Sequence, residues 1–408
     1  MGRESMKNVI FITTLTLWSM GKGTGGPAFT KTIGKYVDEG WNVYLVSDEP
    51  HNADFPQLDR EHNIQIRPSA FKPFLQIRKL GLVFRMLDHV VANRRFYRTI
   101  RKLLKSLSGE TVLYAYEIFG VKAAAKAARK SGLPVVSRFQ GTILSQYKNT
   151  LFNRIRRYPH FQALSEKTDL VIMTDDGTKG DQVLDELGND SKRLFLRNGL
   201  DLMNRDIEAM YSSFDREAFR KRFGVSPDET LLLTVSRLVP WKKVDRAIEG
   251  VAACRADKVR LLVVGDGDCK EELISLAEKR NVSDKVIFAG AVAHDDVYQY
   301  MMACDIFISL YDLSNVGNPL LEAMTLGKCI VTLDVGDTFK LINDRENGIL
   351  LNYQNLNSLG NVISELAENE KLRKDLGDKA ALFAQENFYS WEKRMDAEFE
   401  EVSALTSE

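Results

Sequence analysis

The chain has few of the residues that bind metals or form covalent cross-links. It holds four cysteines and five histidines among 408 residues. The cysteines are scattered without a Cys-x-x-Cys pair, and the histidines show no His-x3-His spacing. Neither a zinc site nor a disulfide framework is therefore indicated. We expect small buried thiols in a reducing, cytoplasmic setting.

Long hydrophobic runs are also missing. No apolar segment approaches the roughly 20 residues that a membrane-spanning helix needs. The apolar start at residues 8–14 lacks the cleavage-site pattern of a secretory signal and predicts a first strand instead. We expect a cytoplasmic protein that stays in solution or attaches peripherally to the inner face of a membrane. Low-complexity tracts and internal repeats are absent as well.

The charge is balanced but unevenly distributed. Lysine plus arginine and aspartate plus glutamate number 56 each. Residues 67–105 nevertheless hold eleven cations and one acid, Asp88, with apolar residues between them, and a second basic cluster lies within 148–158. Basic amphipathic segments suit an anionic membrane surface. A solvated helix face whose other side is core gives the same pattern, and nucleic acid is not expected, because no binding motif accompanies the charge.

Short apolar segments alternate with longer helical stretches along the chain. Most of the apolar segments are rich in Val, Ile, Leu and Phe without polar alternation, which is typical of parallel strands covered on both faces. The sequence therefore predicts two α/β units, divided near residues 197–205. The expected strands are 8–14, 42–47, 111–116, 134–138 and 170–174, then 231–236, 259–265, 286–289, 306–310 and 329–333.

The segment from Ser309 to Lys328 predicts a buried strand, a loop containing glycine, and a helix that begins near Pro319. Proline suits the first turn of a helix, and the unpaired N–H groups there favour a phosphate. Glu322, about one turn into the helix, would repel a phosphate but accepts hydrogen bonds from sugar hydroxyls. Such a loop beside such a carboxylate is the minimal nucleotide-sugar site, although an ordinary strand–turn–helix gives the same pattern.

Two cations follow another apolar strand. Arg237 and Lys242 lie just past residues 231–236, and ligands bind at the carboxyl ends of open parallel sheets. Arginine presents a planar fork to phosphate oxygens, and lysine adds a mobile charge. Together they would offset the charge of a diphosphate leaving group; two unrelated surface cations are the alternative.

The ordered set of motifs resembles glycosyltransferase family 4, whose members are retaining, metal-independent enzymes of the GT-B architecture. The resemblance implies two Rossmann-like, doubly wound α/β domains that face each other across a cleft. An acceptor-binding domain would span 1–198, a nucleotide-sugar-binding domain 199–388, and a C-terminal helix at 389–408 would pack back toward the first domain. The matching segments are Gly23–Pro27, Arg197–Asp201, Arg237 with Lys242, Leu261–Gly267, Val286–Val292, Gly317–Glu322, Gly327 and Trp391.

The resemblance also implies the site residues. No metal or other cofactor is expected, because a metal at the Asp-x-Asp of Asp266 and Asp268 would duplicate the role of the two cations. The implied catalytic residues are Arg237, Lys242 and Gln140. The implied donor-binding residues are Gly25, Gly26, Gly267, Val292, Ser314, Asn315, Val316, Gly317, Asn318, Pro319, Leu320 and Glu322.

Two positions depart from the family pattern. Ser314 stands where the family has the first Glu of its Glu-x7-Glu motif, and Gln140 stands where it commonly has a histidine. Both changes fall in the pocket for the transferred sugar. Nucleotide binding is therefore expected, whereas the identity of the sugar stays open.

The expected reaction is transfer of a sugar, with retention, from a nucleotide-diphosphate sugar to an acceptor hydroxyl. A UDP-sugar is favoured over a GDP-sugar. The acceptor would be a glycan, a lipid-linked molecule or a small molecule, in the synthesis of surface polysaccharide or glycoconjugates. Peripheral contact with an anionic membrane would use residues 67–105 and 148–158. Two alternatives stay open: a nucleotide-sugar epimerase or hydrolase of the same architecture, and a non-catalytic nucleotide-sugar-binding protein.

Overall fold

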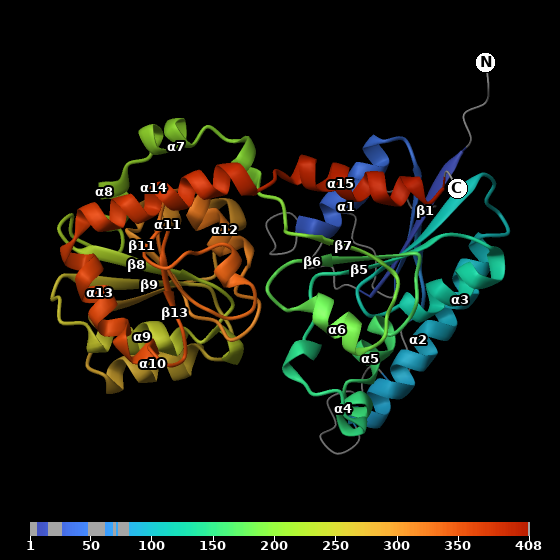
Figure 1. Ribbon diagram of the computed structural model, residues 1–408, viewed down its shortest axis with the longest axis horizontal. Coiled ribbons are helices and arrows are strands. Elements are labelled where there is room, and N and C mark those ends of the chain that lie inside the picture. Colours follow the sequence, from blue (N-terminus) through green and yellow to red (C-terminus); the bar gives the residue numbers. More distant parts are fainter. Residues whose placement is uncertain (1–5, 15–26, 48–61, 68–70, 72–80, 407–408) are drawn as a thin grey trace. The chain divides into compact units, whose positions relative to one another are not determined.

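The computed structural model describes residues 6–14, 27–47, 62–67, 71 and 81–406, which form two compact units (Figure 1). The first unit takes the described residues up to 175, then 179–197 and 392–406. The second unit takes 176–178 and 198–391. The main division of the chain thus falls between Arg197 and Asn198.

Parallel strands form the sheet of the first unit. The strand order reverses between β1 and β4, because the chain adds β2 and β3 on one side of β1 and then returns to the other side. This reversal makes the sheet doubly wound. In spatial order its described strands are β3 (Asn63–Gln65), β2 (Asn42–Ser47), β1 (Lys7–Thr13), β4 (Glu110–Tyr116), β5 (Val135–Phe139), β6 (Leu170–Thr174) and β7 (Lys192–Leu196).

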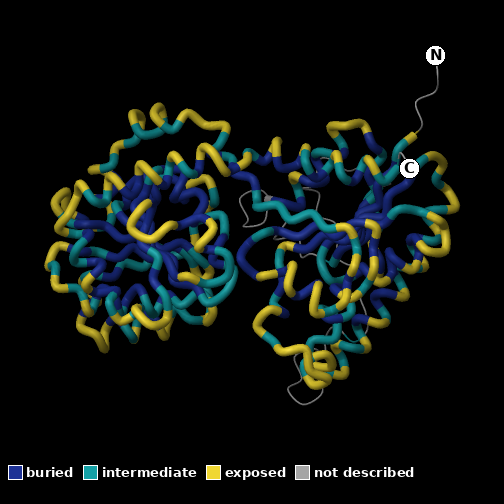
Figure 2. The backbone as a smooth tube through the Cα atoms, in the orientation of Figure 1, coloured by how far each residue is buried: buried dark blue, intermediate teal, exposed yellow. Residues whose placement is uncertain are grey.

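Helices cover both faces of this sheet, so its inner strands β1, β4, β5 and β6 are buried (Figure 2). Alternate strand residues point to opposite faces, which is why Phe11 joins one core and Ile10 the other. The Phe11 side is covered by α1 (Pro27–Asp38) and α15 (Trp391–Ala404). The Ile10 side is covered by α2 (Gly81–Leu103), α3 (Val121–Ser131), α5 (Tyr158–Leu164) and α6 (Gly180–Glu186), and a short α4 (Leu151–Arg156) precedes α5.

The second unit repeats this plan. Its parallel strands run in the order β10 (Val286–Gly290), β9 (Val259–Val264), β8 (Thr230–Val235), β11 (Ile306–Ser309), β12 (Cys329–Leu333) and β13 (Ile349–Leu351), with the reversal between β8 and β11. One face is covered by α8 (Arg216–Lys221), α11 (His294–Ala303), α12 (Asn318–Thr325) and α14 (Glu370–Asn387). The other is covered by α9 (Val244–Ala253), α10 (Lys270–Lys279) and α13 (Leu359–Glu368), and α7 (Ile207–Ser213) lies before α8.

The ten predicted strands are all present, and each of their bounds falls within one residue of the prediction. The sequence analysis missed β3, β7 and β13, which lie at sheet edges. Two doubly wound α/β units agree with the predicted fold class. Among the described helices, none is both long and apolar enough to cross a bilayer.

A buried ion network joins α15 to the sheet of the first unit. Glu398 of α15 is 1% exposed, and its Oε2 lies 3.5 Å from Nε of Arg138 on β5. Arg394 donates a hydrogen bond to the same oxygen, and the Tyr114 hydroxyl donates to Oε1. Burial opposes ionisation of Glu398, but the two guanidinium groups and the tyrosine outweigh it and lower the pKa of this carboxyl.

We predict that Glu398→Gln lowers the free energy of unfolding of the first unit by about 3–5 kcal/mol at neutral pH, because two guanidinium groups then stay buried without their counter-charge. Urea denaturation followed by circular dichroism measures the change. Glu400→Gln, on an exposed side chain of the same helix, is the matched control and should shift the free energy by less than about 0.5 kcal/mol.

The effect of Glu398→Gln should also depend on pH. The pKa of Glu398 is lowered from its ordinary value of 4.5, so its contribution is complete above that value and is lost as the pH falls through the lowered pKa. The difference between wild type and variant should therefore shrink in acid. A difference that grows in acid would contradict the network.

Candidate functional site

The candidate site lies where the strand order of the second unit reverses. β8 and β11 are hydrogen-bonded neighbours, with Ile306 opposite Leu232 and Phe307 opposite Leu233. Both strands are parallel, so their carboxyl ends reach the same edge of the sheet. That edge, at the reversal, is the usual ligand position in doubly wound folds. The segments that follow these two strands carry most of the predicted site residues.

Arg237 and Lys242 follow β8 and lie close to each other. The Arg237 guanidinium is exposed, 5.9 Å from the centroid of the Trp241 ring. Lys242 is partly buried, 4.1 Å above the Tyr311 ring, and its Nζ donates to the Ser314 carbonyl at 3.3 Å. Among the residues that the structure describes, neither cation forms an ion pair with a carboxylate. Neither cation is therefore neutralised by a direct ion pair.

Burial of the Lys242 ammonium has a measurable consequence. It lowers the pKa of Lys242 to about 8, with a further lowering by the charge of Arg237 and an opposing effect from Asp176. An anion beside Lys242 would favour the protonated form. The arrangement therefore suits a ligand that brings negative charge.

The N-terminus of α12 opens beside these cations, after β11. The helix begins at Asn318, next to the predicted Pro319, and Gly317 is its N-cap residue. Gly317 has no side chain to cap the helix, and no acidic residue occupies the first turn. The positive end of the helix dipole is thus left to an external anion.

Side-chain hydrogen bonds hold the loop between β11 and α12 in place. Ser314 has a positive φ of 54°, a conformation that is uncommon for residues other than glycine. The buried Asn315 side chain donates to the Leu333 carbonyl at 2.8 Å, and also contacts two threonine hydroxyls. The Asn315 side chain is therefore used to fix the loop, so that only its backbone is left for a ligand.

Asp176 also holds this loop, and the sequence analysis missed it. Its Oδ2 accepts a hydrogen bond from Ser314 Oγ at 2.8 Å, and its Oδ1 accepts one from Thr178 Oγ1 at 2.7 Å. Its carbonyl accepts from the Val316 N–H at 3.3 Å. Burial raises the pKa of Asp176, although these hydroxyls and the charge of Lys242 oppose the shift. Because Asp176 precedes Ser314 by 138 positions, no local pattern in the sequence links the two.

Glu322 lies in the second turn of α12 and is 2% exposed. Its Oε1 is 3.1 Å from Nε2 of His294, the first residue of α11. This hydrogen bond raises the pKa of His294, and burial of the imidazole opposes the shift. The predicted Val292 precedes His294 by two residues and is partly buried. A carboxylate and an imidazole therefore stand together on the flank of the site.

Other predicted donor-binding residues serve the architecture of the second unit. Gly267 has φ 156°, and a Cβ there would lie 2.4 Å from the Leu238 carbonyl oxygen, so packing alone requires glycine. The Asn318 side-chain oxygen accepts from Asn198 Nδ2 at 2.9 Å. Leu320 is buried in the core. Among the described residues, no group of three or more His, Cys, Asp or Glu side chains is placed to hold a metal ion.

Gln140 belongs to the first unit, where it follows β5. Its backbone N–H donates to Glu117 Oε1 at 2.7 Å, and its Nε2 donates to the Tyr116 hydroxyl at 3.1 Å. Gly25 and Gly26 lie outside the described residues. The second unit thus brings together Arg237, Lys242 and residues 314–322, and the roles assigned to the individual site residues stay predictions.

Comparisons with known proteins agree with this fold. A family model described as glycosyl transferases group 1 matches residues 215–383. An uncharacterized glycosyltransferase of Methanocaldococcus jannaschii is 30% identical over 375 residues, or 90% of each chain. A Campylobacter jejuni enzyme named as an N-acetylgalactosaminyltransferase acting on a diphospho-undecaprenol-linked sugar is 27% identical over 235 residues, covering 57% of this chain and 60% of that one.

A solved structure gives the same fold class. HepE from Anabaena in complex with UDP matches with a TM-score of 0.72 at 19% identity, covering 97% of this chain and 100% of that chain. Two Rossmann-like units with doubly wound parallel sheets define a GT-B glycosyltransferase. The chain belongs to the glycosyl transferases group 1 family and is an enzyme of the glycosyltransferase class, EC 2.4.

We predict that Glu322→Gln lowers the pKa of His294, because the raised value depends chiefly on the hydrogen bond and charge of this carboxylate. A proton NMR titration of the imidazole measures the midpoint. Asp295→Asn is the control and should shift the midpoint less, since Asp295 is the smallest of the named causes. An unchanged midpoint in Glu322→Gln would show that the two side chains are not paired in solution.

Proposed function

We propose that this glycosyltransferase is a retaining enzyme of family 4 that uses a nucleotide-diphosphate sugar as donor. The observation that carries the proposal is the meeting of Arg237, Lys242 and the uncapped N-terminus of α12 at one edge of the sheet. Two cations that form no direct ion pair among the described residues, together with a helix dipole, match the charge of a diphosphate.

The same groups would stabilise the leaving group. The bond between the anomeric carbon and the diphosphate oxygen breaks, and the acceptor oxygen bonds to that carbon on the same face of the sugar. Negative charge then grows on the diphosphate, where preorganised cations and N–H groups act most strongly. The leaving phosphate oxygen takes the acceptor proton, so no separate strong base is needed. Because the cations already balance the diphosphate charge, we propose that no metal ion takes part.

The donor proposed is a UDP-sugar, with a GDP-sugar as the second choice. HepE, the structural neighbour, has been solved with UDP. The buried Glu322 carboxylate lies one turn past the start of α12, which suits the ribose hydroxyls of a nucleotide whose diphosphate is at the helix start. The acceptor would be a glycan, a lipid-linked molecule or a small molecule in the synthesis of polysaccharide or glycoconjugate. The Campylobacter relative, whose name includes a lipid diphosphate, supports a lipid-linked acceptor.

The function is tested at the two cations. Arg237→Ala and Lys242→Ala should each weaken UDP binding roughly ten- to hundredfold, because each removes a charge-assisted hydrogen bond that contributes about 1.5–3 kcal/mol. Isothermal titration with UDP and GDP measures binding, and sugar transfer from a panel of UDP- and GDP-sugars measures turnover. Lys279→Ala, on a cation of α10 outside the site, is the matched control and should bind as wild type does.

Each other outcome of this experiment has a definite meaning. Wild-type UDP affinity in both Arg237→Ala and Lys242→Ala would remove the proposed site. Binding without turnover would favour a nucleotide-sugar-binding protein, and release of free or epimerised sugar would favour a hydrolase or epimerase. Turnover should persist in excess EDTA; its loss, with rescue by Mn²⁺ or Mg²⁺, would overturn the metal-independent chemistry.

We further propose that Asp176 supplies the carboxylate that Ser314 lacks. The two side chains are hydrogen-bonded, and Asp176 is the buried acid beside the loop that would face the transferred sugar. A hydroxyl at position 314 with a carboxylate behind it is shorter than a glutamate and leaves more room. This geometry favours a donor sugar that differs from glucose at its 3- or 4-position, or a site that accepts several sugars.

We predict that Ser314→Glu lowers turnover with the native donor about tenfold or more, because two carboxylates would then share a buried space. UDP affinity should stay near wild type, since Arg237, Lys242 and Glu322 are unchanged. Adding Asp176→Asn removes one of the charges and should restore part of the turnover. Ser314→Glu that speeds transfer from UDP-glucose, or a double variant without any rescue, would contradict this role of Asp176.

A further inference from the structure

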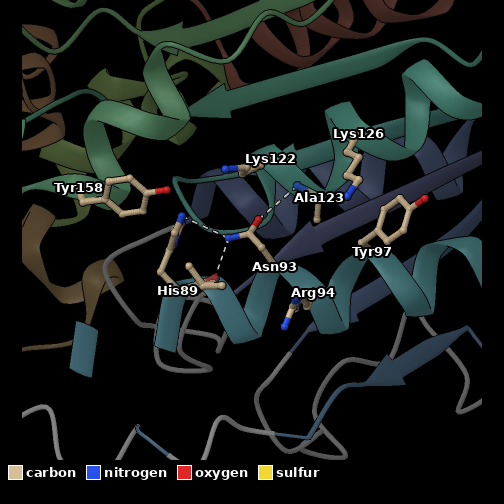
Figure 3. A pocket seen from close by; sticks show the side chains of 9 residues that line it. His89, Asn93, Arg94, Tyr97, Lys122, Ala123, Lys126 and Tyr158 are labelled. Carbon is tan, nitrogen blue, oxygen red and sulfur yellow. Dashed lines mark hydrogen bonds between the residues drawn. The ribbon is translucent and has the colours of Figure 1, made fainter. Parts of the chain in front are cut away.

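A pocket of about 130 Å³ lies in the first unit between α2, α3 and α5 (Figure 3). It is smaller than the roughly 300–1,000 Å³ of sites that enclose whole small molecules. Several water volumes of about 30 Å³ each would fit in it. The space therefore suits one small chemical group of a larger ligand.

The wall of the pocket contains a buried polar group without a partner. His89 is 2% exposed, and its Nε2 lies 2.8 Å from Gln162 Oε1. The Gln162 amide nitrogen donates to Glu166, so the Gln162 oxygen faces the imidazole, and Asn93 Nδ2 lies 3.2 Å from the same Nε2. Within the described residues, no hydrogen-bond partner reaches the buried Nδ1. Burial lowers the pKa of His89, so the ring is neutral at neutral pH.

The rim of the same pocket is cationic. Arg94 of α2 and Lys122 and Lys126 of α3 line it together with His89, and no carboxylate lines it. In the described part of the chain, none of these three cations forms an ion pair. Glu166, which accepts the hydrogen bond from Gln162, is already paired with Arg129 at 2.8 Å, and Asp88, whose charge acts on His89, does not line the pocket. An anionic group in this pocket would meet three uncompensated positive charges.

An exposed apolar surface leads to this pocket. Val83, Leu87 and Val90 repeat at intervals of four and three residues along one face of α2, with exposed fractions of 53%, 40% and 44%, and Val90 also lines the pocket. The next positions on that face are the cationic Arg94 and the ring of Tyr97. The stripe thus passes from apolar side chains directly to the cationic rim.

The helix α4 adds to this surface. It ends two residues before Tyr158, whose ring lines the pocket 5.7 Å from the His89 ring. Its Leu151, Phe152 and Ile155 are 75%, 68% and 44% exposed. With the α2 stripe they make up six of the twelve large hydrophobic side chains that are exposed in the described chain. Exposed hydrophobic side chains are usually scattered singly over a protein surface. Their concentration on two helices therefore indicates an interaction surface.

We propose that the pocket binds the phosphate group of a membrane lipid, while the exposed apolar side chains of α2 and α4 contact the acyl region. The phosphate would be held by Arg94, Lys122 and Lys126, the three cations that line the pocket. This proposal rests on the proposed function, because an enzyme with a lipid-linked acceptor would meet that acceptor at a membrane surface. Its chemistry requires an anion and an apolar body in one molecule, which free phosphate lacks.

The test uses the full chain with vesicles of phosphatidylcholine, with and without phosphatidylglycerol, in a co-sedimentation assay. Wild type should bind the anionic vesicles and bind the zwitterionic ones much less. Lys122→Ala/Lys126→Ala should weaken binding about fivefold for each lysine, the equivalent of roughly 1 kcal/mol per cation near an anionic surface. Lys130→Ala/Lys279→Ala removes the same charge from the last turns of α3 and α10, outside both basic segments, and should bind as wild type does.

Two further experiments distinguish lipid binding from binding by charge alone and from binding of free phosphate. Leu151→Ser/Phe152→Ser should weaken vesicle binding at least tenfold, and wild-type binding by this variant would show that no apolar contact is made. Short-chain phosphatidylglycerol below its micelle concentration should shift the NMR signals of the His89 imidazole, whereas inorganic phosphate should not. An equal shift with inorganic phosphate would make the pocket a free-phosphate site and overturn the proposal.

The remaining outcomes separate this inference from the proposed function. An equal loss of vesicle binding in Lys130→Ala/Lys279→Ala would show that binding depends on general charge and would overturn the pocket. UDP binding should be unaffected by Lys122→Ala/Lys126→Ala. If vesicle binding fails while sugar transfer is intact, the lipid site alone is overturned. If UDP binding fails while vesicle binding is intact, the nucleotide-sugar function alone is overturned.

Discussion

The pairing of β8 with β11 is the constraint on which the candidate site depends. The two strands are separated in the sequence by β9 and β10, yet they are hydrogen-bonded neighbours because the strand order reverses between them. This neighbourhood places the turn that carries Arg237 and Lys242 beside the loop that leads into α12. Lys242 and Ser314 are 72 positions apart in the sequence, yet Lys242 Nζ lies 3.3 Å from the Ser314 carbonyl oxygen. If β8 and β11 were not neighbours, the cations and the helix N-terminus would lie apart along the carboxyl edge of the sheet.

The electrostatics of this edge follow from burial without a counter-charge. Lys242 loses water to the Tyr311 ring and the Ser314 carbonyl, and its pKa falls to about 8. Asp176, on the other side of Ser314, loses water as well, and its pKa rises. Each group is thus moved toward its neutral form. An anion between the cations and the helix N-terminus would oppose the pKa shift of Lys242, and the proposed diphosphate would supply such an anion.

The sequence was informative where a residue's role is local. Strands such as β8, buried on both faces, have continuous apolar runs, so their bounds could be predicted within one residue. The missed strands lie at edges: β7 begins with two cations and is only partly buried, and β13 has three residues. Neither carries a periodic signal long enough to distinguish a strand from a loop. The helix start near Pro319 could likewise be predicted, because proline and glycine act on the backbone directly.

The parts of the site that escaped prediction depend on contacts between distant segments. Nothing near Asp176 indicates that it accepts a hydrogen bond from Ser314. Asn315 carries a side-chain amide of the kind that binds ligands, but this amide points into the interior of the second unit. Gly267 was expected to approach a ligand, and the structure gives a sufficient reason in the closeness of the Leu238 carbonyl. The residue types of Asn315 and Gly267 indicated a special role at these positions. The residues that they contact could not be predicted, because the sheet topology determines which distant segment lies beside each of them.

The basic segment around α2 shows why two interpretations of one sequence pattern need not exclude each other. Before the structure, its apolar residues suited either a membrane surface or the core. Phe96 and Ile100, in the second half of α2, are fully buried against the sheet, whereas Val83 and Leu87, in the first half, are exposed. One helix therefore supplies core at one end and an uncovered apolar stripe at the other. In the proposed lipid complex, the cations that follow the stripe would meet the anionic headgroup.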